Sequence, residues 1–218
     1  MVATLTWLPA AALGLAGAVF GILADRLAAR WPEHETPGIR SPDWRTGLVV
    51  LLSAGAFAAL PARFASGRDL LLASVFFAAL VVLLATDLDQ RLLPDELTLP
   101  LIPATLLVLL AGWNPVLADK QLGVASGLAA AILAPLFLGV TGALFRGALG
   151  MGDLKLAVSL GLACGLSQLF AGFVVASLAS GVVLVALLAS RRLGLRSAIP
   201  FGPILILAAF LAVLRPVT

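Results

Sequence analysis

Cysteine, histidine and charge are scarce in this chain. Its 218 residues include one cysteine, one histidine and no tyrosine, and only 11% are charged, whereas soluble domains carry about 25%. The single Cys164 excludes a disulfide framework and a thiolate metal site. The single His34 cannot form a metal centre by itself. Together with a mean hydropathy of +1.12, the low charge excludes an ordinary soluble domain.

The net charge of +3 is small and is spread over several short polar stretches. Such a distribution is better explained by membrane orientation than by a nucleic-acid surface, which needs a clustered basic patch. We therefore expect the lipid bilayer as a partner and no nucleic acid.

Long apolar runs predict an all-α fold, a polytopic membrane helical bundle. About 20 apolar residues cross the hydrocarbon core, and in lipid the backbone polar groups need internal hydrogen bonds. We expect about eight transmembrane helices. They cover roughly residues 5–24, 46–62, 70–86, 96–112, 121–145, 154–166, 168–190 and 199–214.

These spans predict one membrane domain over residues 1–218. Residues 1–66 would form an N-terminal two-helix part around a short cytoplasmic loop, 25–45, and residues 67–218 would form the core. Placing both termini outside puts most of the 14 lysines and arginines in inner loops, as the positive-inside rule requires. No basic residue precedes the first apolar run, so we expect this run to remain as an anchor and not to be a cleaved signal.

Two acidic positions fall on the same predicted side of the membrane. Asp87 ends the third expected span, Asp153 opens the sixth, and two spans separate them. Two carboxyls that share a site do not both ionise cheaply, so one keeps a proton while the other is an anion. An aspartyl protease needs at least such a pair of carboxyl groups. The glycines Gly150 and Gly152 before Asp153 would let the backbone approach a partner helix or a substrate.

Each of these polar residues also has a purely structural interpretation. Asp153 could cap a helix that starts after the glycine turn, and Asp95 could cap the helix that follows Pro94. Asp89 could be a solvated loop charge. Lys155 could steady a carboxylate or contact a lipid phosphate.

Three segments, in order along the chain, resemble motifs of one family. Residues 150–156 (GMGDLKL) resemble the second catalytic motif of the prepilin peptidases, also called type IV leader peptidases. Residues 87–100 are similar to the first motif of that family, and residues 199–203 (IPFGP) are similar to its C-terminal signature. The glycine-x-glycine-aspartate signature alone would be weaker, because presenilin-type proteases share it.

This resemblance implies an aspartyl endopeptidase of the inner (cytoplasmic) membrane, with its active site near the cytoplasmic face. Such enzymes remove the short basic leader, typically after a glycine, from prepilin or pseudopilin precursors, before the apolar helix of the mature chain. The family's catalytic aspartates correspond to Asp87 and Asp153, and no metal is implied in the site. The supporting residues of the motifs are Gly150, Gly152, Asp89, Asp95 and Lys155. Which pilin or pseudopilin is the substrate stays open.

One departure from the family concerns its cofactors. Many members carry an N-terminal cytoplasmic domain with paired, zinc-binding cysteines, and they methylate the new N-terminus with S-adenosylmethionine. The loop 25–45 contains no cysteine. We therefore expect a short form that lacks the zinc-cysteine module and acts as a peptidase, without zinc and without S-adenosylmethionine.

Two alternatives from other functional classes fit part of the pattern. Ionisable residues at membrane boundaries and broken helices also mark ion and substrate paths in transporters. The acidic loops could instead be docking surfaces of a structural subunit in a secretion or pilus complex. Substitution of the two aspartates separates these possibilities, because only the protease depends on them for leader removal.

Overall fold

The computed structural model describes residues 7–32, 41–117, 120–144, 150–189 and 201–215. Within these ranges the regular structure is entirely helical, which confirms the all-α class. The helices are α1 (Trp7–Ala28), α2 (Trp44–Arg63), α3 (Gly67–Gln90), α4 (Asp95–Leu110), α5 (Lys120–Leu144), α6 (Met151–Ala189) and α7 (Gly202–Leu214). Each expected span overlaps one of them, and the sixth and seventh expected spans share α6.

Five stretches of the described helices are long and apolar enough, by length and composition, to cross a membrane. They are α1, α2, α3, residues Leu122–Leu144 of α5 and residues Met151–Val183 of α6, whereas α7 is shorter. Their outer faces expose large apolar side chains, such as Ile132 and Val182, which soluble monomers rarely show in contiguous patches. The protein is therefore a polytopic membrane helical bundle. The number of eight spans and the sides of the termini stay predictions.

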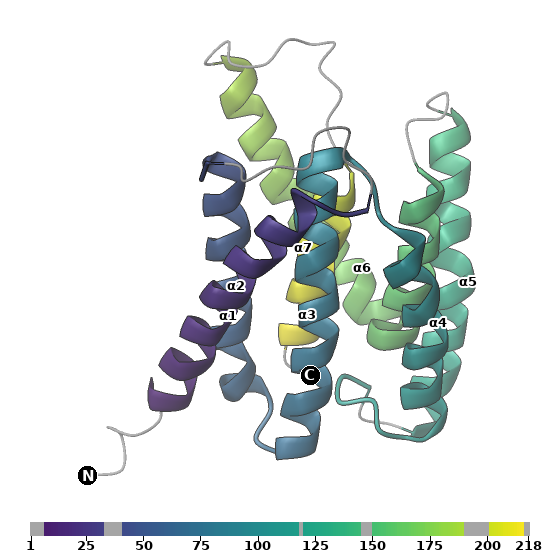
Figure 1. Cartoon of the computed structure of the whole chain (residues 1–218). Coiled ribbons are helices and arrows are strands. Elements are labelled where there is room, and N and C mark those ends of the chain that lie inside the picture. Colours follow the sequence, from purple (N-terminus) through teal and green to yellow (C-terminus); the bar gives the residue numbers. More distant parts are fainter. Residues whose placement is uncertain (1–6, 33–40, 118–119, 145–149, 190–200, 216–218) are drawn as a thin grey trace.

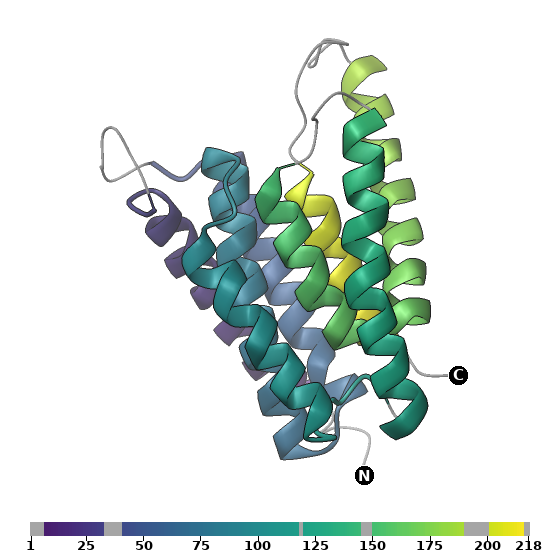
Figure 2. The same cartoon turned by 90° about the vertical axis from the view of Figure 1, so that its right-hand side faces the viewer.

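The helices run up and down between two ends of the bundle (Figure 1). α1 starts at the end where α7 finishes. The C-terminal end of α3 and the N-terminal ends of α4, α6 and α7 lie at the opposite end (Figures 1 and 2). We call this opposite end the site end, because it contains the end of α3 with Asp87 and the start of α6 with Asp153.

α3 is the central helix of the half of the bundle that carries Asp87. It packs against α1, α2 and α7, and its Phe77, Leu80 and Leu84 are fully buried. The Phe77 ring contacts the ring of Phe57 in α2 at 6.3 Å and the ring of Phe210 in α7 at 4.7 Å between centroids. Aromatic pairs at these distances add to the packing energy. They fix the middle of α3, ten residues before Asp87, against α2 and α7.

α6 reverses its direction at Gly165. The part before Gly165, which we call the first arm (151–164), and the part after it, the second arm (166–189), run in nearly opposite directions (Figure 2). Gly165 has φ 68° and ψ 177°, a combination that is essentially restricted to glycine. The Asn114 amide donates hydrogen bonds to the last carbonyls of the first arm, those of Leu162 and Ala163. These bonds satisfy groups that a helix end would otherwise leave unpaired.

Replacing Gly165 by alanine is expected to destabilise the fold. A Cβ there would lie 2.8 Å from Leu117 Cδ2 and from Ser126 Oγ, and the backbone conformation costs about 1–3 kcal/mol for a residue other than glycine. Gly181→Ala in the second arm is the control, because a Cβ at that position meets nothing within 4 Å. Thermal unfolding in detergent, followed by circular dichroism, should show a lower Tm for Gly165→Ala only. Equal Tm values for the two variants would contradict the conclusion that residue 165 has to be a glycine.

Candidate active site

Asp87 lies in the last turn of α3 and is almost completely buried. The residue is 5% exposed, and its Oδ2 atom is buried without a hydrogen-bond partner among the described residues. α3 ends four residues later at Arg91, whose left-handed conformation turns the chain toward α4. A buried carboxylate oxygen without a partner is costly in a purely structural role. The environment of Asp87 is therefore unlike that of a surface charge or a helix cap.

The first residue of α7, Gly202, lies directly against the Asp87 carboxyl group. A Cβ on Gly202 would be 2.7 Å from both Cγ and Oδ2 of Asp87, which is closer than van der Waals contact permits. Glycine is therefore required for α7 to start at this distance from the carboxyl. The IPFGP motif marked this segment in the sequence, but the contact with Asp87 was missed. Residues 199 and 200 of the motif lie outside the described residues.

Asp153 lies in the first turn of α6, which also begins at the site end. Its Oδ2 atom accepts a hydrogen bond of 3.1 Å from the backbone N–H of Gly150. This bond is one half of a capping box, in which an acidic residue at the third helical position reaches back to the residue that precedes the helix. Asp153 is 8% exposed, and its Oδ1 atom is buried without a partner among the described residues. The structural role in capping thus uses one oxygen and leaves the other available.

Gly152 lies where the segment after Asp87 packs against the segment that carries Asp153. A Cβ on Gly152 would lie 2.8 Å from Leu93 Cβ and 3.1 Å from the Leu93 carbonyl oxygen. The connection between α3 and α4 therefore packs against the start of α6. Gly150 is different, because a Cβ there would make only ordinary contact, at 3.5 Å, with Asp153 Oδ2. The close approach proposed for both glycines is seen at Gly152 alone.

The carboxyl groups of Asp87 and Asp153 are close enough to interact electrostatically. They come from two helices that are separated by two others in the sequence, and both are buried at the site end. Two such groups repel each other when both are ionised, so the pair favours a state with one shared proton. The unpartnered oxygens Asp87 Oδ2 and Asp153 Oδ1 are then free to bind a water molecule and a substrate carbonyl.

Asp95 and Lys155 form an ion pair between α4 and α6. The Lys155 Nζ atom lies 2.7 Å from both carboxylate oxygens of Asp95, and the Asp95 side chain is 55% exposed. Of the two interpretations of Lys155, the structure shows contact with a carboxylate. The proposed capping role of Asp95 is not seen, because Pro94 holds the cap position and Asp95 is the first helical residue.

Asp89 is not a solvated loop charge, as one interpretation of the sequence held. It lies in the last turn of α3, its side chain is 6% exposed, and its Oδ1 atom accepts a 2.9 Å hydrogen bond from Arg45 Nη1 at the start of α2. The neighbouring Gln90 donates to the carbonyl of Ala28, the last residue of α1, and to that of Trp31, which follows the helix. These bonds fasten the N-terminal helix pair to the end of α3, two residues from Asp87.

Asp89→Asn is expected to lower stability and to retain activity. It replaces a charge-assisted hydrogen bond to Arg45 by a weaker neutral one, a loss of about 1–2 kcal/mol. Asp89 makes this contact on the side of α2 and has no role in the chemistry expected of Asp87 and Asp153. A lower Tm with leader removal within a few-fold of wild type is the expected result, measured on the same detergent-purified sample. Loss of leader removal at an unchanged Tm would instead place Asp89 in the chemistry.

The described residues contain no group of three or more histidine, cysteine, aspartate or glutamate side chains that could hold a metal ion. The one cysteine, Cys164, is buried in the first arm of α6. His34 and most of the loop 25–45 lie outside the described residues. The prediction that the site uses no metal and no cofactor therefore stays a prediction.

Fold and site together define a polytopic membrane protein with two buried aspartates, from separate helices, at one end of its bundle. The chain belongs to the Type IV leader peptidase family, which it matches over residues 74–185, just over half of its length. Both Asp87 and Asp153 lie within the matched range, and Gly202 lies beyond it.

Curated relatives of this chain carry the name prepilin leader peptidase/N-methyltransferase. The relative from Aeromonas hydrophila is 33% identical over 185 residues, which are 84% of this chain and 63% of the relative. The relative from Bacillus subtilis (strain 168) is 32% identical over 168 residues, which are 75% of this chain and 63% of the relative. The chain thus spans about three fifths of the length of these relatives. No solved structure matches it significantly.

Proposed function

We propose that this protein is a membrane aspartyl endopeptidase that removes the basic leader from prepilin-like or pseudopilin precursors. The observation that carries the proposal is the buried, interacting pair Asp87 and Asp153, each with one carboxylate oxygen that has no partner among the described residues. The family match supplies the substrate class, because the curated relatives are named for prepilin leaders.

The reaction needs one ionised and one protonated carboxyl. The oxygen of a bound water adds to the scissile carbonyl carbon while the ionised carboxyl takes a proton from that water. The protonated carboxyl gives its proton to the carbonyl oxygen, so the tetrahedral intermediate carries two hydroxyl groups. The C–N bond then breaks as the first carboxyl passes its proton to the leaving nitrogen, and a hydroxyl proton returns to the second. Because the two groups titrate as a unit, the shared proton belongs to the pair.

The charge of the loops supports a site near the cytoplasmic face of the inner membrane. The helix ends at the site end and the segments that connect them contain ten of the 14 lysines and arginines, whereas Arg63, Arg68, Lys120 and Arg215 belong to the other end. Positive charge is enriched on the cytoplasmic side of membrane proteins. A precursor with a basic leader on that side and an apolar helix in the membrane would present its junction at the depth of the two aspartates.

We further propose that leader removal by these 218 residues needs neither zinc nor S-adenosylmethionine. One cysteine in the sequence is too few for a paired-cysteine zinc site. The mechanism above also uses only water and two carboxyls. The methyltransferase named for the relatives is thus not part of the function that we propose for this chain.

The test is a cleavage assay with purified protein in detergent or lipid vesicles. A prepilin-like precursor is incubated with the protein, a metal chelator and S-adenosylmethionine that carries a labelled methyl group. We expect mass spectrometry to show a cut at the leader junction and an unlabelled new N-terminus. An intact precursor would refute the peptidase, and a labelled N-terminus would refute the restriction to peptidase activity.

A further inference from the structure

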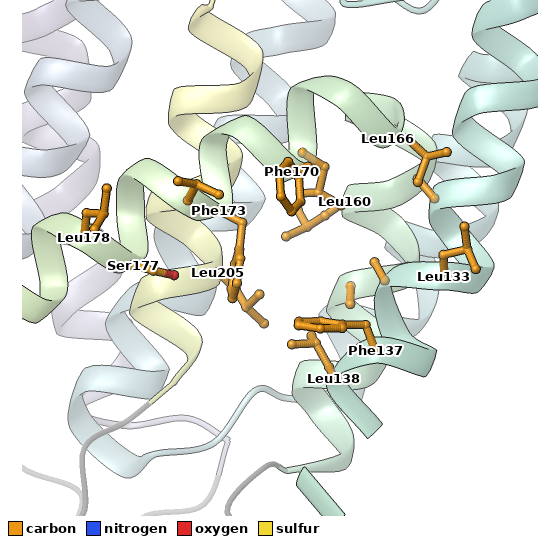
Figure 3. A pocket seen from close by; sticks show the side chains of 15 residues that line it. Leu133, Phe137, Leu138, Leu160, Leu166, Phe170, Phe173, Ser177, Leu178 and Leu205 are labelled. Atoms are coloured by element: carbon orange, nitrogen blue, oxygen red, sulfur yellow. The ribbon is translucent and has the colours of Figure 1, made fainter. Parts of the chain in front are cut away.

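An apolar groove opens on the side of the bundle between α5, the two arms of α6, and α7. Its volume is about 430 Å³, within the range of ligand-binding pockets. Ser177 has the only polar side chain among the described residues that line it. The other walls are aliphatic or aromatic and include Phe137, Leu160, Phe173 and Leu205, which point into the groove in Figure 3.

The groove begins about one helical turn from the site, on the side toward the middle of the bundle. Ala157 lines it and is four residues beyond Asp153 on α6, a rise of about 6 Å. Leu205 lines it from α7 and is three residues beyond Gly202, the residue that contacts Asp87. The Phe173 ring in the groove also contacts the ring of Phe201, which precedes Gly202, at 6.2 Å between centroids. The wall of the groove is therefore continuous with the site.

A second apolar groove, of about 280 Å³, lies between α3 and α4 and lacks this continuity. Ala79 is its lining residue on α3 nearest to Asp87, and eight residues of helix separate the two, about 12 Å. Of the two grooves, only the first has lining residues within about one helical turn of Asp153 and of Gly202, namely Ala157 and Leu205.

The burial of the aspartates restricts how a substrate chain reaches them. Asp87 is 5% exposed and Asp153 is 8% exposed, so the scissile peptide has to enter between helices. A polar or charged leader would lose its hydration in a groove lined by leucine, phenylalanine and alanine, at a cost of several kcal/mol. An apolar segment that already lies in the bilayer has no such penalty, and it can move sideways into the groove from lipid.

We propose that this groove binds the apolar segment that follows the scissile bond of the substrate. The inference rests on the proposed function and adds to it a binding surface for the membrane-embedded part of the precursor. The first turn of this segment lies against Ala157 and Leu205, which brings the preceding junction to Asp87 and Asp153. A lipid chain and a second copy of this protein are the competing occupants.

A cross-linking experiment identifies the occupant without relying on cleavage. The precursor carries one cysteine in the first two turns of its apolar segment, and the protein carries Asp87→Asn together with Leu133→Cys in the wall of the groove. Leu128→Cys is the matched control, because Leu128 is 41% exposed against 49% for Leu133 and does not line the groove. The native Cys164 is buried and leaves the new cysteine as the reactive thiol of the described residues.

We expect a disulfide between precursor and protein at Leu133→Cys and much less of it at Leu128→Cys. A disulfide between two copies of the protein, unchanged by precursor, would overturn the proposal in favour of a second copy. Equal labelling of both cysteines by a membrane-dissolved thiol probe, with no protection of Leu133→Cys by precursor, would overturn it in favour of lipid.

Filling the groove provides an independent kinetic test. Ala134→Trp places a large ring in the groove, and Ala125→Trp is the control, because Ala125 lies on the opposite face of α5 and outside the lining. For the complete precursor we expect Ala134→Trp to raise KM by about tenfold or more. A short peptide that ends a few residues after the junction should be cleaved equally by both variants. Unchanged KM for the complete precursor would overturn the proposal.

Cleavage by the wild-type protein tests the proposed function separately from the groove. If the wild-type protein cleaves the precursor and the groove variants show neither the cross-link nor the KM effect, the groove inference fails alone. If the wild-type protein cleaves no precursor while the cross-link forms, the proposed function fails and the groove still binds an apolar segment.

Discussion

Replacing Asp87 or Asp153 by asparagine is expected to abolish leader removal. Asparagine has nearly the shape of aspartate but neither takes up nor releases the proton that the reaction transfers. General acid–base catalysis contributes on the order of 10²- to 10⁴-fold to such reactions, so each variant should lose at least about a hundredfold in kcat/KM. The measurement is the rate of precursor cleavage at equal amounts of folded protein.

The control for this experiment is Asp95→Asn. Asp95 belongs to the same motif as Asp87, residues 87–100, but its carboxylate is 55% exposed and pairs with Lys155. Exposed ion pairs contribute about 0–1 kcal/mol, so this variant should cleave within a few-fold of wild type. Removal of the charge at Asp87 or Asp153 should leave the Tm unchanged or higher, because a neutral side chain is easier to bury. Cleavage at the wild-type rate by either asparagine variant would remove that residue from the pair.

Replacing Gly202 by alanine is expected to cost about a hundredfold in kcat. The new Cβ would lie 2.7 Å from Cγ and Oδ2 of Asp87, so either the carboxyl or the start of α7 has to move by a large part of an ångström. Misplacement of a catalytic group on that scale costs about 10²-fold. KM should change little, because the wall of the groove starts a turn further along α7.

Gly55→Ala in α2 is the matched control, because a Cβ at that position meets nothing within 4 Å. Equal Tm values for the two variants would show that the loss of kcat at Gly202→Ala is not a loss of folding. Gly202 would then be a positioning residue that acts through Asp87. Wild-type kcat for Gly202→Ala would contradict the close contact between α7 and the carboxyl.

The positions of the helices followed from hydropathy, since each apolar run that was expected to cross the membrane overlaps a helix. The turn near residue 165 also followed from composition, where a glycine interrupts two short apolar runs. What hydropathy does not contain is the direction of the chain after the glycine. That direction depends on contacts of Gly165 with Leu117 and Ser126.

The sequence predicted less of the site than of the helices. The acidic motifs marked Asp87 and Asp153 because carboxylates are rare in so apolar a chain. The sequence did not identify the partner of Asp89 and left two interpretations of Lys155 open, since their partners Arg45 and Asp95 lie 44 and 60 residues away along the chain. The contact between Gly202 and Asp87 likewise depends on how α7 packs against α3, and no local pattern records it.

A comparison of single and double variants shows whether Asp87 and Asp153 act as one catalytic unit. The rate of precursor cleavage is measured for Asp87→Asn, Asp153→Asn and the double variant, with protein in excess and long incubation. When two residues act together in one step, removing either one already removes their joint contribution, so the effects of the two substitutions are not additive. We expect the double variant to be no slower than the slower single variant. A double variant whose loss equals the product of the two single losses would contradict it.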